Sequence, residues 1–102
     1  MIMILELAIL YIKDEQVNQF ENDFDKAGIY ISSIKGYGGH TLQKCIEQKN
    51  KYILLVNWET LYAHTIGFRE SSQYREWKKL LHQYYDPFPI VEHYETVIDK
   101  RM

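Results

Sequence analysis

The residues best suited to chemistry in this chain lie in one stretch, Asn57 to Tyr94, which holds both tryptophans and three of the four histidines. A histidine titrates near neutral pH and can serve as a general base. An arginine can hold a substrate oxyanion, and a tryptophan can wall an apolar pocket. This density of polar-tipped aromatic side chains exceeds what a purely structural core needs.

Each histidine also has a structural interpretation. His64 lies beside the apolar stripe of a short helix, where it is either a base or bonded to a backbone carbonyl. His93 shares a strand face with valines and is best interpreted as a core or interface residue satisfied by a neighbour. His40 follows two glycines, where the backbone can approach a ligand closely, yet a strand-edge histidine fits equally well. His82 is predicted to be a solvated surface residue.

Two further choices stay open at this point. Arg69 could hold an oxyanion or form an ion pair with Glu59 or Glu70, and the ion pair is somewhat favoured. The aromatic side chains could be core, pocket lining or both. A metal site of three histidines has no support from spacing such as His-x-His, so no metal is predicted.

The elements that must position these residues follow from hydrophobic periodicity. Strands are expected at Ile2–Ile12, Thr41–Glu47, Lys51–Glu59 and Ile90–Ile98. Apolar residues at spacings of three and four predict a helix after Asp14, which should cap it, and Gly36 should end the segment. A short helix from Thr60 and a second piece capped by Ser71 or Ser72 complete a β-α-β-β-α-β order, an α+β fold of the ferredoxin-like type with a four-stranded antiparallel sheet.

The first and third strands are apolar on both faces. In an antiparallel sheet with one face exposed to solvent, apolar and polar residues should alternate along each strand. The two helices can cover only one face. A second copy of the chain is the economical cover for the other, so we expect a homodimer with two sheets packed face to face.

Composition narrows the class of protein. The 102 residues fit one domain spanning residues 1–102. A net charge of −2 argues against a nucleic-acid partner, and the apolar N-terminus is too short to cross a membrane. Cys45 is the only cysteine, so no intramolecular disulfide can form and a cytoplasmic location is expected.

The sequence resembles the antibiotic biosynthesis monooxygenase family of dimeric α/β barrels over about residues 3 to 97. The resemblance is carried by the stretch NWETLYAHTIGFRESSQYREW, by the step Gly36-Tyr37 and by the strand from Pro89 to Tyr94. What it implies is a homodimer that oxidises a small aromatic, phenolic or quinol substrate with no bound cofactor. The alternative is a non-catalytic module of the same fold that binds a small apolar molecule or acts in a stress response.

Under the oxygenase interpretation the resemblance gives each candidate residue a role. The catalytic residues would be His64 as base, with Arg69 or Tyr74 as the oxyanion partner. The remaining candidates are expected to bind the substrate: His40, Trp58, Phe68, Trp77 and His93.

Overall fold

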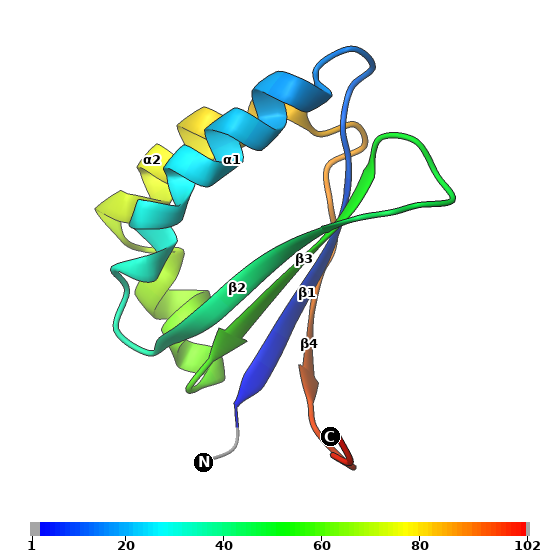
Figure 1. Cartoon of the computed structure of the whole chain (residues 1–102). Coiled ribbons are helices and arrows are strands. Elements are labelled where there is room, and N and C mark those ends of the chain that lie inside the picture. Colours follow the sequence, from blue (N-terminus) through cyan, green and yellow to red (C-terminus); the bar gives the residue numbers. More distant parts are fainter. Residues whose placement is uncertain (1–2, 102) are drawn as a thin grey trace.

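The structure, a computed structural model, describes residues 3–101 and contains four strands and two α-helices. The elements follow one another in the order β1 (Ile4–Tyr11), α1 (Val17–Ser32), β2 (Tyr37–Lys44), β3 (Lys51–Trp58), η1 (Ala63–Phe68), α2 (Ser72–Leu81), η2 (His82–Tyr84) and β4 (Val91–Glu95). The strands form one antiparallel sheet in the order β2-β3-β1-β4. Both α-helices lie on the same side of that sheet (Figure 1). The ferredoxin-like α+β fold expected from the sequence is therefore confirmed.

The inner face of the sheet packs against the helices and forms the core. Alternate residues of β3, namely Tyr52, Leu54, Val56 and Trp58, point inward and are buried. Helix α1 meets them with residues at spacings of four, three and four: Phe20, Phe24, Ala27 and Ile31. Its periodicity therefore matches the sequence prediction, because one helical face carries all of these apolar side chains.

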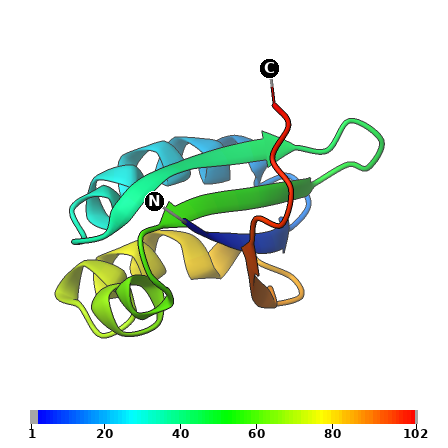
Figure 2. The ribbon, with the colours of Figure 1, turned by 90° about the horizontal axis from the view of Figure 1, so that it is seen from below.

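The outer face of the sheet is also apolar. Leu7 pairs with Leu55 and Ile9 pairs with Ile53 across β1 and β3, all four on the side away from the helices. No helix among residues 3–101 covers this face, and Figure 2 shows the same one-sided arrangement from below. In the described part of the chain, no helix has the length and apolarity needed to cross a membrane.

Several boundaries differ from those expected. Helix α1 begins at Val17, and its cap residue Gln16 makes no side-chain cap bond. Asp14 does not cap the helix, which begins three residues later, and its Oδ1 accepts a hydrogen bond from Asn50 Nδ2 at 2.5 Å. Strand β2 starts at Tyr37, earlier than expected, while β4 ends at Glu95. The proposed start of the first strand at Ile2 lies outside the described residues.

The first helical piece after β3 differs in type from the short helix expected, whereas the second piece agrees with the prediction. Residues Ala63–Phe68 form a π-helical turn, which is wider than an α-helix. Ser71 then caps α2, its Oγ accepting from the Tyr74 backbone N–H at 3.0 Å, which settles the choice between Ser71 and Ser72. Gly36 has φ +92, and a Cβ there would approach the Cβ of Ala63 to 2.7 Å, so this turn requires glycine.

Replacing Phe20 by Ala should lower the free energy of unfolding by about 3–5 kcal/mol, because a large core side chain is lost and a cavity remains. Phe20 is 0% exposed and its ring meets Phe24, Tyr52 and Tyr84 edge-on. Urea denaturation followed by circular dichroism measures the change. The control is Ile29→Ala on the same helix, at a side chain 68% exposed, which should stay within about 0.5 kcal/mol of the parent.

Candidate active site

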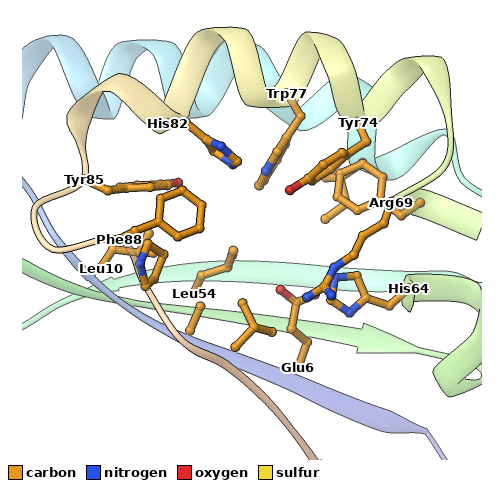
Figure 3. A pocket seen from close by; sticks show the side chains of 15 residues that line it. Glu6, Leu10, Leu54, His64, Arg69, Tyr74, Trp77, His82, Tyr85 and Phe88 are labelled. Atoms are coloured by element: carbon orange, nitrogen blue, oxygen red, sulfur yellow. The ribbon is translucent and has the colours of Figure 1, made fainter. Parts of the chain in front are cut away.

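A cavity of about 440 Å³ lies between the inner face of the sheet and helix α2. Figure 3 shows side chains of α2 on one side of the cavity and the sheet on the other, as its floor. The segment after η2 closes one end. Its lining combines an apolar body with several polar tips: Glu6, Ala8, Leu10, Ile31, Leu54, His64, Phe68, Arg69, Tyr74, Trp77, His82, Tyr85, Phe88, Pro89 and Val91.

Glu6 is a buried carboxyl group on the cavity floor. It occupies an inward position of β1 between Val56 of β3 and His93 of β4, and it is 5% exposed. Its Oε1 accepts a hydrogen bond from Trp58 Nε1 at 2.9 Å and lies 3.3 Å from His64 Nε2. Its Oε2 has no hydrogen-bond partner within residues 3–101. This oxygen is accessible from the cavity.

Three neighbours, Trp58, Glu6 and His93, hold the ring of His64 in place. The π-helical turn η1 directs it toward the sheet, where its ring stacks on Trp58 with centroids 5.3 Å apart and planes 16° apart. Its Nε2 faces Glu6, and its Nδ1 lies 2.7 Å from His93 Nε2. Both ring nitrogens of His64 therefore already have protein partners.

Burial governs the protonation of this group of residues. It raises the pKa of Glu6 above the usual 4.5, against the lowering effects of the Trp58 hydrogen bond and the nearby Arg69 cation. Burial also lowers the pKa of His64, and the positive charge of Arg69 adds to that effect. The pKa of His93 is lowered by the same two causes. His64 and His93 are therefore neutral near pH 7.

Three polar side chains that line the cavity have tips without protein partners. The guanidinium of Arg69 and the hydroxyls of Tyr74 and Tyr85 make no hydrogen bond or ion pair with residues 3–101. Burial raises the pKa of Tyr85, so its hydroxyl keeps its proton and can donate. Figure 3 shows these tips directed into the cavity from different sides, an arrangement suited to a ligand that carries oxygen acceptors.

Aromatic rings supply the walls. Phe68 meets Tyr74 and Trp77 edge-on, with centroids 5.1 and 5.7 Å apart. At the opposite end Phe88 meets the ring of His82 with centroids 4.8 Å apart. A flat aromatic ligand would find ring faces and edges on both sides of such a cavity.

The predicted site residues fall in different places. The cavity lining includes His64, Phe68, Arg69, Tyr74 and Trp77. Trp58 does not line it, because the ring is fully buried behind His64. His93 contacts His64 from β4 without lining it.

His40 lies elsewhere, in a second groove of about 660 Å³ between α1 and β2. It is hydrogen-bonded there to the hydroxyl of Tyr37 through Nδ1, at 2.5 Å. The three-histidine metal site considered from the sequence therefore does not form. No other group of three His, Cys, Asp or Glu within residues 3–101 is placed to hold a metal ion.

Sequence reasoning missed part of the lining. His82, expected at the surface, is half-buried and lines the cavity because the chain leaves α2 there and turns inward. Arg69 does not form the expected ion pair with Glu59 or Glu70 among the described residues. Glu6 was also missed, although a lone charge inside an apolar strand was the signal that could have found it.

Comparison with known proteins identifies the class that this fold and cavity represent. The family model described as antibiotic biosynthesis monooxygenase matches residues 3–80, so the chain belongs to this family. The uncharacterised protein YczJ of Bacillus subtilis (strain 168) is 54% identical over 95 residues, covering 93% of this chain and 100% of YczJ.

Two solved structures extend the comparison. A Bordetella bronchiseptica protein, described as a candidate antibiotic biosynthesis monooxygenase, is 31% identical with a TM-score of 0.91, over 96% of this chain and 100% of its own. SnoaB of Streptomyces nogalater, a cofactor-independent oxygenase, is 15% identical with a TM-score of 0.71, over 100% of this chain and 98% of its own. At that identity SnoaB supports the fold alone.

Replacing Glu6 by Gln should stabilise the fold increasingly as pH rises. The native pKa of Glu6 is raised, so wild-type stability is fully present below the unfolded value near 4.5 and is lost as pH rises through the native pKa. Gln does not ionise, so the E6Q variant does not lose stability in this way. Between the unfolded and the native pKa of Glu6, the stability difference between E6Q and wild type should grow by up to about 1.4 kcal/mol per pH unit. Above the native pKa the difference should level off. Urea denaturation at a series of pH values measures it, and a difference independent of pH would contradict it.

Proposed function

We propose that this protein is a monooxygenase that needs no bound cofactor and acts on a small aromatic, phenolic or quinol substrate. In the overall reaction, a phenol with a ring C–H para to its hydroxyl becomes a quinone. Dioxygen supplies the new carbonyl oxygen, and its second atom leaves as water with the hydrogens of the C–H and O–H bonds. The substrate itself therefore supplies the electrons.

One observation carries this proposal. The polar ends of Arg69, Tyr74 and Tyr85, which have no hydrogen-bond partner among residues 3–101, converge on one cavity that aromatic rings line. Its volume of about 440 Å³ falls within the usual range for small-molecule sites, about 300–1,000 Å³. An aromatic substrate would fill the apolar body of the cavity, and its oxygen would receive hydrogen bonds from these tips.

The chemistry that such a cavity favours is stabilisation of a substrate anion. Loss of a proton makes a phenol or quinol electron-rich enough to reduce dioxygen directly, so the protein need only bind, deprotonate and shield it. In this proposal Arg69 and Tyr74 hold the developing oxyanion. Trp77 and Phe68 pack against the ring. Two titratable groups, Glu6 and His64, line the cavity floor, and in this proposal one of them takes the proton.

Family membership supports the same reaction class, because the family is described as one of monooxygenases. The fold is shared with SnoaB, a protein described as a cofactor-independent oxygenase. We place this activity in the cytoplasm, since the single Cys45 leaves no intramolecular disulfide to require an oxidising compartment.

We also propose that the working form is a homodimer whose subunits join through the outer faces of their sheets. Those faces carry Leu7, Leu55, Ile9 and Ile53, and a two-fold arrangement would bury them against their own copies. Tyr94 of β4, 47% exposed on the same face, would extend the interface.

Oxygen uptake by purified metal-free protein, measured over quinols, anthrones and reactive phenols, tests the proposed activity. Replacing Arg69 by Gln removes the cation that holds the oxyanion, and we expect kcat/KM to fall by at least about tenfold to a hundredfold. The matched control is Arg75→Gln, at an exposed arginine of α2 that does not line the cavity. No uptake by wild type on any compound would point to the binding module instead.

Replacing Leu7 by Lys should convert the proposed dimer to a monomer. Leu7 lies opposite Leu55 on the outer face, so each new ammonium group would be buried without a partner between the two sheets of the proposed dimer. Light scattering at micromolar concentration should give a mass near twice 12.3 kDa for wild type and near 12.3 kDa for the variant. Gln19→Lys, at an exposed position of α1, is the control. A wild-type protein of monomer mass would refute the dimer.

A further inference from the structure

We propose that Glu6 is the catalytic base of this site, and that its carboxylate Oε2 takes the proton of the substrate hydroxyl while His64 and His93 position it. This proposal rests on the proposed function, in that the ligand is taken to be a phenol or quinol. It assigns the base to a residue of β1 that sequence reasoning did not select.

The carboxylate of Glu6 has lone pairs free to face a ligand, whereas both ring nitrogens of His64 are occupied. A base needs a lone pair that faces the substrate. The two nitrogens of His64 face Glu6 Oε1 at 3.3 Å and His93 Nε2 at 2.7 Å, so neither is directed at the cavity. Glu6 Oε2 has no partner among residues 3–101 and borders the cavity, where Figure 3 shows the carboxyl group pointing. The cavity therefore offers the carboxylate, and not the imidazole, to a ligand.

The contacts around Glu6 Oε1 keep their direction when Oε2 gains or loses a proton. With its hydrogen on Nε2, neutral His64 places this nitrogen 3.3 Å from Glu6 Oε1 and accepts at Nδ1 from His93 Nε2–H. Trp58 Nε1–H donates to the same Oε1. This arrangement is unchanged whether Oε2 is ionised or protonated. Glu6 can therefore gain and lose a proton without any rearrangement around it, as a preorganised base requires.

Neutral groups and one cation surround the carboxyl group of Glu6. From β3 it faces the neutral donor Trp58, from β4 and η1 the neutral histidines His93 and His64, and from across the cavity the tyrosine hydroxyls. Arg69 is the cation near it. Burial raises the pKa of Glu6 in this setting, which makes its ionised form a stronger base than an ordinary glutamate.

The proton-transfer step is simple. The substrate O–H bond breaks, the proton moves to Glu6 Oε2, and the electron pair stays on the substrate oxygen. The negative charge thereby moves from the carboxylate to the substrate, where Arg69 and the hydroxyl of Tyr74 can stabilise it. The site as a whole keeps the same net charge.

The first test is the pH profile of oxygen uptake. Wild-type kcat/KM should fall at low pH as Glu6 becomes protonated, which gives the pH profile an acidic limb. In Glu6→Gln, kcat/KM should be lower by about a hundredfold or more, and this acidic limb should be absent. Trp58→Phe removes one donor to Oε1, which raises the pKa of the carboxyl group and should move the limb to higher pH. Glu76→Gln on the exposed face of α2 is the matched control and should behave as wild type.

The second test needs no turnover. A dinitrophenolate, ionised throughout the pH range used, mimics the substrate after proton transfer. Its binding to wild type, followed by quenching of tryptophan fluorescence, should be accompanied by uptake of one proton on Oε2. Above the native pKa of Glu6, the Kd should therefore rise by about tenfold per pH unit. In Glu6→Gln the Kd should be nearly independent of pH.

The outcomes separate the two proposals. Oxygen uptake that survives in Glu6→Gln, or proton uptake on dinitrophenolate binding that persists in this variant, would overturn Glu6 as the base and return that role to His64. An absence of oxygen uptake by wild type, with proton-linked binding that the variant loses, would refute the oxygenase function. It would leave Glu6 as the proton acceptor of the cavity.

Discussion

The buried carboxyl group of Glu6 is the feature around which the cavity is organised. A carboxyl group taken out of water at the centre of a sheet costs several kcal/mol unless neighbouring groups satisfy it. Trp58 and His64 meet that need on one oxygen, and each must be held in place to do so. Trp58 is fixed by the pleat of β3, and His64 by its stack on the indole ring. Satisfying one buried group thereby orders one side of the site.

The π-helical turn η1 explains how His64 reaches that position. Its wider turn places His64 and Phe68 on the buried side, and Arg69 follows directly at its end. The sheet-facing imidazole, the aromatic wall and the cation of the cavity thus come from six consecutive residues. Single π-helical turns are uncommon and occur often at functional sites, which agrees with this arrangement.

The sequence predicted the elements better than it predicted the site. Helix α1 followed from apolar spacing, and the sheet followed from the four strand segments and their order, because burial imposes these patterns on the sequence. Glu6 was missed because its partners Trp58 and His64 are more than fifty residues away in the chain. His82 was assigned to the surface from its place on a helix, but the chain turns inward there through η2. Long-range pairings and local departures from α-helical geometry leave no periodic signal.

Strand β1 contributes one face to the cavity and the other face to the surface proposed for dimer assembly. Glu6, Ala8 and Leu10 point toward the helices, whereas the residues between them point to the opposite face. A shift of one residue in the pairing of β1 would move the carboxyl group to the apolar outer face and place Leu7 on the cavity floor. Both errors would be costly, since in the proposed dimer the first buries an unpaired charge, and the second removes the partner of Trp58 and His64. The pairing register of a single strand therefore fixes the position of the proposed base and the apolarity of the outer face together.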